Sequence, residues 1–279
     1  MNTKAILFLC SLLCNNAITF SQAARGNLFI IGGGHRSPEL VKTLISTAAL
    51  EKSDYIVVLP MSSGEPDSSY YYIAKQLEKV CTNTIANLNF TKEKINDLKW
   101  IDSVKNARLI FIPGGDQNRF MHIVLHTPLY DAIHFAYKNG ATIAGTSAGA
   151  ALMSKNMISG NELIGDTTYH ETFRKLQQGN IEFKEGLGLI DSAIIDQHFV
   201  VRSRYNRLLS ALAIFPTFPC IGIDEATAII VHGNKVTVTG ESQVIVITDP
   251  VKMAVINGLI KVNDVHFSIY TTGDTFKLK

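Results

Sequence analysis

Short apolar runs alternate with longer segments of helical periodicity over the first 155 residues of the chain. The apolar runs are continuous rather than alternating, which is typical of strands buried on both faces of a parallel sheet. The pattern therefore predicts an α/β fold with a mainly parallel central sheet and helices on both of its faces. The predicted strands are 27–34, 55–60, 84–90, 108–116 and 141–150, and the predicted helices are about 37–52, 68–80, 92–103 and 128–140.

Glycines gather where three of these strands end, at 32–34, 114–115 and 145–149. Ligands of such sheets bind at the carboxyl ends of the strands, so we expect the three segments to share one rim and to surround the functional site. The first segment does not match a dinucleotide-binding motif, because the last glycine of Gly-x-Gly-x-x-Gly would have to stand where the chain has Ser37. Pro38 is instead a helix opener.

The second half of the chain predicts different elements. Residues 155–186 are polar and predict a loop-rich excursion with a short helix near 170–178 (HETFRKLQQ). A strand-like run at 187–199 then leads into an amphipathic helix at about 201–215. From residue 220 onward β-branched residues and turns predict antiparallel strands that close one edge of the sheet. No linker separates these parts, which favours a single domain over residues 24–279.

The first 23 residues have the features of a secretory signal peptide. Lys4 precedes an apolar run, and Ser21 and Ala23 stand three and one positions before a cleavage site. The run is too short for a membrane span, and lipid attachment at Cys14 is the weaker alternative. We therefore expect a secreted or periplasmic protein.

Removal of this segment takes away Lys4, so the 26 basic residues become 25 against 24 acidic residues, a net charge of +1. This balance predicts no nucleic-acid partner. The remaining Cys81 and Cys220 allow one disulfide at most and match no metal-binding pattern.

Ser147 stands where an apolar strand stops and a small-residue helical pattern begins, in the stretch GTSAGA. A Gly-x-Ser-x-Gly turn of this kind exposes the serine hydroxyl, and the following helix directs backbone N–H groups toward it. We interpret Ser147 as a nucleophile, although a plain turn with a helix-capping serine fits these residues equally well. The turn in PGGDQ can add a backbone N–H donor, and Gln117 can supply an amide to a substrate.

A nucleophilic serine needs a histidine base and a carboxylate that orients it. Among the eight histidines, His198 stands at a predicted strand end beside Asp196 and Gln197, on the rim where Ser147 should project. The carboxylate is narrowed to Asp224 or Glu225 in IGIDEATA, which face opposite ways in an extended chain. Spacing alone does not choose between them.

Taken together, PGGDQ, GTSAGA, DQHFVVRSRYNRL and GIDEATA resemble the cyanophycinase group of serine peptidase family S51, over about residues 27–247. The resemblance implies a flavodoxin-like or class I glutaminase-like sandwich with a Ser147, His198 and Glu225 triad. It implies an oxyanion hole made of the N–H groups of Gly115 and Ala148. The substrate-binding residues it implies are Gln117, Asp196, Gln197, Arg202, Arg204 and Arg207.

Cyanophycinases cleave a poly-aspartate that carries arginine on each side-chain carboxyl, and they release β-Asp-Arg dipeptides. The physical chemistry agrees in part, because arginine forks suit a substrate with free carboxylates. The chain departs from the family pattern in a longer segment between Ser147 and His198 and in Asn206, where a glycine is common. Because of these departures, the resemblance predicts the type of reaction better than the range of substrates.

The predicted function is hydrolysis of cyanophycin through an acyl-enzyme, without a metal or organic cofactor. Two alternatives are an exported aspartyl or isoaspartyl dipeptidase and a non-catalytic binder of peptides. The arginines of DQHFVVRSRYNR favour cyanophycin among the enzymes, because relatives that remove aspartate from short peptides do not carry them. The resemblance also allows a homodimer, because family members are often dimers.

Overall fold

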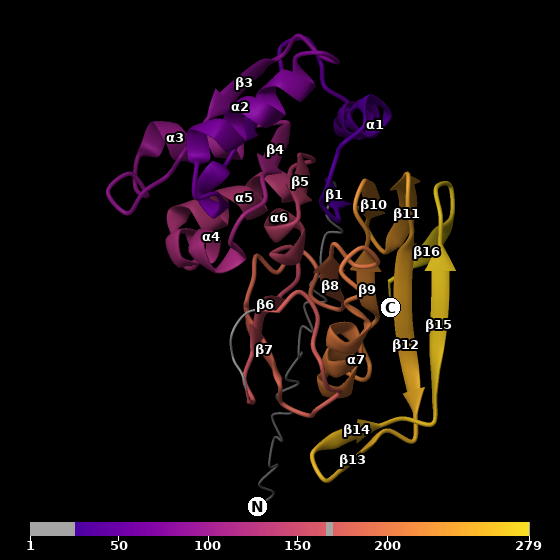
Figure 1. Cartoon of the computed structure of the whole chain (residues 1–279). Coiled ribbons are helices and arrows are strands. Elements are labelled where there is room, and N and C mark those ends of the chain that lie inside the picture. Colours follow the sequence, from indigo (N-terminus) through magenta and orange to yellow (C-terminus); the bar gives the residue numbers. More distant parts are fainter. Residues whose placement is uncertain (1–25, 166–169, 279) are drawn as a thin grey trace, which may run out of the picture.

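The computed structural model describes residues 26–165 and 170–278 (Figure 1). The predicted signal peptide, with Cys14, lies outside the described residues. The larger sheet of the described chain contains eight strands, which are β1 (Asn27–Ile31), β2 (Tyr55–Val58), β3 (Thr84–Asn87), β4 (Leu109–Ile112), β5 (Thr142–Thr146), β10 (Thr227–His232), β11 (Lys235–Gly240) and β16 (Thr275–Lys277). Their order across the sheet is β16-β11-β10-β1-β5-β4-β2-β3. The first five strands run parallel, as predicted, and the other three continue the sheet antiparallel beyond β1.

Helices cover both faces of this sheet, which explains why its strands are apolar throughout. The helices of the described residues are α1 (Pro38–Ala48), the 3₁₀ turn η1 (Pro60–Ser62), α2 (Pro66–Leu77), α3 (Leu98–Lys105), α4 (Gln117–Val124), α5 (Pro128–Lys138), α6 (Ala148–Ala151) and α7 (Tyr205–Ile214). In β1, Phe29 packs in the core that α1 and α2 share, whereas Leu28 packs in the core that contains α3, α4 and α5. Adjacent strand residues point to opposite faces, so a strand covered on both sides needs no polar positions.

A second sheet corrects the prediction for the end of the chain. It is built from β8 (Ile194–Gln197), β9 (Cys220–Ile223), β12 (Val244–Val251) and β15 (Asp264–Tyr270), in the order β15-β12-β9-β8. Only β10, β11 and β16 close the edge of the larger sheet as expected. Figure 1 shows the second sheet with α7 packed beside it, away from α1 and α2. Strand identity is a local property, whereas the partner of each strand depends on distant chain segments.

The segment after residue 155 is also more regular than predicted. It forms an antiparallel hairpin of β6 (Asn156–Glu162) and β7 (Ile181–Glu185), and β13 (Ala254–Ile256) and β14 (Leu259–Lys261) form another. The expected helix near 170–178 is absent from these described residues. Gln177 instead bridges to Leu259, and the N–H of Ile260 donates to the carbonyl of Leu176. Pairing with β14 thus replaces the helical hydrogen bonds of this stretch.

Two further predictions concern single residues. Ser37 caps α1, its hydroxyl accepting from the N–H of Leu40 at 3.3 Å, and Pro38 is the first residue of that helix as expected. Cys81 and Cys220 are both free thiols. None of the helices in residues 26–165 and 170–278 combines the length and hydrophobicity that a membrane crossing requires.

Candidate active site

Ser147 lies in a strained turn between β5 and α6. Its backbone adopts φ 54° and ψ −110°, and residues other than glycine rarely adopt a positive φ. A Cβ atom on Gly145 would come 2.1 Å from the carbonyl oxygen of Gly149, and one on Gly149 would come 2.1 Å from that of Ile112. The two glycines are therefore required by close backbone contact, and the turn holds the serine hydroxyl above the end of the sheet.

His198 and Glu225 approach this hydroxyl from the second sheet. The Oγ atom of Ser147 lies 2.7 Å from Nε2 of His198, and Nδ1 of His198 lies 2.5 Å from Oε1 of Glu225. His198 directly follows β8, and its backbone N–H donates to the carbonyl of Gly32 at the end of β1. The site thus joins strand ends of two sheets, whereas the sequence predicted a single shared rim.

The structure separates the two neighbouring carboxylates. Glu225 points to the imidazole of His198, while Asp224 is buried and accepts from the N–H groups of Val200 and Val201 and from the hydroxyl of Ser242. Asp224 thereby ties the turn after His198 to the second sheet. Of the two carboxylates that spacing left open, Glu225 is the one that contacts the imidazole.

Burial sets the protonation of His198. Desolvation is the main cause that lowers the pKa of the imidazole below its ordinary value, and the positive charge of Arg202 lowers it further. The hydrogen bond to Glu225 acts in the opposite direction. A lowered pKa keeps the imidazole neutral at neutral pH, and a neutral Nε2 can accept the proton of Ser147.

The predicted oxyanion donors flank the hydroxyl. Ala148 opens α6 directly after Ser147, and Gly115 lines the same cavity as Ser147. Among the hydrogen bonds of the described residues, none has the N–H of Gly115 or of Ala148 as its donor. Both groups are therefore available to an oxygen that binds next to Ser147.

A cavity of about 260 Å³ on this side of Ser147 gathers most of the predicted substrate-binding residues. Ser159, Gly160 and Asn161 of β6 form one of its walls, so the hairpin after residue 155 is part of the site. The Nε2 atom of Gln117 donates to the carbonyls of Ile158 and Ser159 and fixes this wall. The predicted residues that line the cavity are Gln117, Gln197, Arg202, Arg204 and Arg207.

Asp196 lies behind this cavity rather than in its lining. It is 1% exposed, and its carboxylate accepts from Nε and Nη2 of Arg207, with Nη1 of Arg204 3.7 Å away. Arg204 also donates to the side chain of Gln197 at 2.6 Å. Two buried guanidinium groups thus approach one carboxylate at the floor of the cavity.

The two features expected to depart from the family pattern, Asn206 and the segment between Ser147 and His198, contact each other. The side chain of Asn206 donates to the carbonyl of Phe173, in the segment between β6 and β7, at 2.7 Å. Arg202 pairs with Glu171 of the same segment, with its Nε 3.6 Å from the carboxylate. Arg202 and Arg204 both precede α7, which begins at Tyr205. The segment between β6 and β7 therefore contacts the arginine-containing stretch at the start of α7.

This chain is similar to known proteins in sequence. Residues 28–239 match the model of peptidase family S51. The chain belongs to this family of serine peptidases. It is 30% identical over 270 residues to a cyanophycinase of Trichormus variabilis, covering 92% of this chain and 87% of that protein. A cyanophycinase of Geminocystis herdmanii is 30% identical over 233 residues, covering 81% of this chain and 82% of that protein.

A solved structure shares the fold of this S51 peptidase. The crystal structure of a peptidase from an acI-B1 Actinobacterium superposes with a TM-score of 0.64 at 19% identity. The match covers 92% of this chain and 99% of that one. The likeness supports the α/β architecture with its mostly parallel central sheet.

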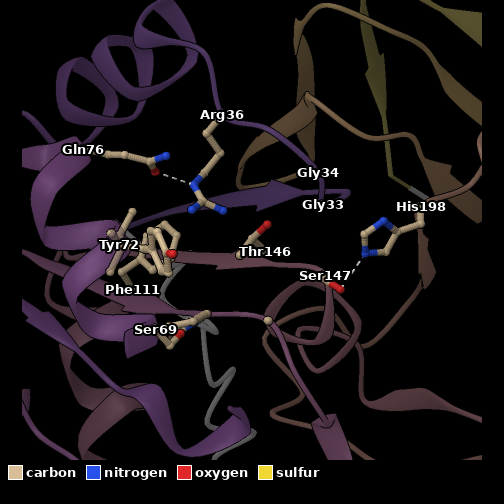
Figure 2. A pocket seen from close by; sticks show the side chains of 13 residues that line it. Gly33, Gly34, Arg36, Ser69, Tyr72, Gln76, Phe111, Thr146, Ser147 and His198 are labelled. Atoms are coloured by element: carbon tan, nitrogen blue, oxygen red, sulfur yellow. Dashed lines mark hydrogen bonds between the residues drawn. The ribbon is translucent and has the colours of Figure 1, made fainter. Parts of the chain in front are cut away.

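A second cavity of this S51 peptidase, of about 340 Å³, opens on the other side of Ser147 (Figure 2). Arg36, Gln76 and Thr146 line it together with Ser147 and His198. Sequence reasoning missed it, because GGGHRSP was weighed only as a nucleotide motif. The available signal was Arg36, a basic residue two positions before α1, on a rim already predicted to be functional.

Proposed function

We propose that this S51 peptidase hydrolyses cyanophycin to β-Asp-Arg dipeptides. The observation that carries the proposal is the pair of buried guanidinium groups, Arg204 and Arg207, which share Asp196 at the floor of a cavity beside Ser147. Every β-Asp-Arg unit bears a free carboxylate on its arginine, and a desolvated guanidinium fork is a strong partner for a carboxylate. The 30% identity to cyanophycinases supports the same substrate class.

The same cavity offers a counterpart for the guanidinium of the substrate. Asp116 is exposed at its edge and uses one carboxylate oxygen to cap α4 through the N–H of Asn118. Its charge complements the arginine of a β-Asp-Arg unit, while the arginine floor complements the carboxylate. A zwitterionic substrate thus finds both partners within one cavity.

The mechanism follows from the geometry of the three side chains. His198 accepts the Ser147 proton at Nε2 while Oγ attacks the backbone carbonyl of an aspartate unit, and Glu225 holds Nδ1–H of the imidazole. The N–H groups of Gly115 and Ala148 stabilise the oxyanion. His198 then gives the proton to the leaving nitrogen, the C–N bond breaks, and the acyl-enzyme reacts with a water that His198 deprotonates.

The experiment compares purified wild-type protein with the Ser147→Ala variant on insoluble cyanophycin and, in parallel, on β-Asp-Ala. Soluble products are identified by mass spectrometry. Release of β-Asp-Arg by the wild type alone supports the proposal. Cyanophycin left intact by the wild type would refute it.

A second candidate is hydrolysis of other aspartyl or isoaspartyl peptides. This alternative is favoured because Arg204 and Arg207 at the floor of the cavity can bind the carboxylate of any aspartyl unit, with or without an attached arginine. It predicts cleavage of β-Asp-Ala with cyanophycin left intact. Activity on neither substrate would favour a peptide-binding role.

We also propose that the protein is exported, because Lys4, the apolar run after it, and Ser21 and Ala23 form a signal-peptide pattern. N-terminal sequencing of the protein from cells and from the extracellular or periplasmic fraction tests this. A chain that begins at Ala24 outside the cytoplasm is the expected result. Retention of Met1 in a cytoplasmic protein would contradict it.

A further inference from the structure

The cavity on the His198 side of Ser147 contains a half-buried arginine, Arg36. Arg36 lies in the loop between β1 and α1. Its Nε donates to Oε1 of Gln76 at 2.8 Å, and its guanidinium stands 5.9 Å from the ring centroid of Phe111. Burial lowers the pKa of Arg36 from its ordinary value. Among the residues that the structure describes, no Asp or Glu forms an ion pair with it.

This arrangement differs from that of the arginines in the other cavity. Arg204 and Arg207 share the carboxylate of Asp196, whereas Arg36 is held by the neutral amide of Gln76 and by an aromatic face. Removing part of the water from a cation is unfavourable unless an anion or a set of hydrogen bonds replaces that water. An anionic ligand would complete the surroundings of Arg36.

Thr146 supplies a second, independent indication of a ligand. It is 5% exposed, and its hydroxyl has no hydrogen-bond partner among the described residues. Buried polar groups of this kind are rarely left unpaired. Figure 2 shows Thr146 between Arg36 and Ser147, and all three residues line the cavity. A carboxylate could accept from both groups.

The chemistry of acyl transfer assigns a side to each cavity. His198 must return a proton to the leaving nitrogen, so the leaving unit binds on the histidine side of Ser147. The cavity with Arg36 is the one that His198 lines, whereas Gly115, an oxyanion donor, lines the cavity with the three arginines. The acyl unit therefore belongs with the three arginines and the leaving unit with Arg36.

We infer that this cavity is the subsite for the leaving peptide unit, and that Arg36, together with the Thr146 hydroxyl, binds a carboxylate of that unit. The inference rests on the proposed function, in which both units next to the scissile bond carry carboxylates. Each side of the bond would then be recognised by its own cationic site. Such a site selects acidic over neutral leaving units.

The test compares an acidic substrate with its amide. The first pair is two linked β-Asp-Arg units and the same compound with the carboxyl groups of its C-terminal unit amidated. The second pair is β-Asp-Ala and β-Asp-Ala amide. The proteins are the wild type, Arg36→Gln, Arg36→Lys and the control Arg108→Gln. Arg108 is also half-buried, but it precedes β4 at the end of that strand that lies away from the site. It donates to the carbonyls of Ala48 and Gly140.

We expect Arg36→Gln to raise KM for the acidic substrate by about ten- to a hundred-fold, the size expected for a charged hydrogen bond. KM for the amide and kcat for both substrates should change little, Arg36→Lys should recover part of the selectivity, and Arg108→Gln should behave as wild type. Equal changes for acid and amide, or no change, would overturn the inference. Cleavage of β-Asp-Ala without cleavage of the linked β-Asp-Arg units would refute the proposed function. In that case the inference about Arg36 is tested with β-Asp-Ala and its amide.

Discussion

The imidazole of His198 occupies the space in which a side chain on Gly33 would stand. A Cβ atom on Gly33 would lie 2.3 Å from Cε1 and 2.5 Å from Nε2 of His198, and the backbone there has φ +122°. On Gly34 the same atom would lie 2.6 Å from Oε2 of Glu225. The glycines after β1 therefore make room for the base and its carboxylate, which accounts for a segment that resembles a nucleotide loop without its spacing.

Gly33→Ala should lower kcat about a hundred-fold or more, because a displacement of about 1 Å at a reacting group has an effect of this size. Steady-state kinetics on the cleaved substrate measures it. Gly273→Ala is the matched control, since Gly273 also has positive φ, at +94°, but nothing stands within 4 Å of its added Cβ. The control should lose some stability and keep its kcat. A Gly33→Ala enzyme with more than half of the wild-type kcat would contradict the geometry.

Ser147→Ala and Glu225→Gln should both lower kcat, by different amounts. Ser147→Ala removes the nucleophile, and kcat should fall by several orders of magnitude. Glu225→Gln keeps the shape but favours the wrong tautomer of His198, and a loss of about 10³- to 10⁴-fold is expected. Ser103→Ala, on α3, removes a hydroxyl that donates to the Lys99 carbonyl and should leave kcat unchanged. A Ser147→Ala variant with a tenth of the wild-type rate would rule out this nucleophile.

The pH profile of kcat/KM should report the lowered pKa of His198. The imidazole must be neutral to accept a proton, so activity should fall as pH drops through its pKa, which lies below the ordinary 6.5. Arg202→Gln removes a charge that lowers this pKa, so the acid limb should move to higher pH. Arg108→Gln should leave the limb in place. A shift of the limb to lower pH in Arg202→Gln would contradict the assignment.

Asp196→Asn should destabilise the fold strongly, because it leaves Arg204 and Arg207 buried without their shared carboxylate. Breaking a buried charge pair in this way lowers the free energy of unfolding by about 3–5 kcal/mol. Urea denaturation measures the change. Glu78→Gln breaks the exposed pair with Lys75 and should leave stability essentially unchanged. A stable Asp196→Asn protein would mean that the arginines do not depend on this carboxylate.

Much of the larger sheet follows from local patterns. The continuous apolar runs of β1, β2, β4 and β5 and the amphipathic helices between them are enough to predict a parallel sheet covered on both faces. The tight turn at Ser147 is local in part, because Gly145 is required by a contact with Gly149, whereas Gly149 is required by a contact with Ile112 at the end of β4. His198 also stands out, as a polar residue at a strand end.

The tertiary structure decided the rest. The assignment of β8 and β9 to a second sheet, the choice of Glu225 over Asp224, and the presence of Arg36 in the cleft depend on contacts between segments far apart in the chain. Periodicity records which faces of an element are buried, but not which distant element buries them. The sequence therefore determined most strands and helices of the larger sheet and the candidate residues of the site, and only the packing of the two sheets determined which side chains meet at Ser147.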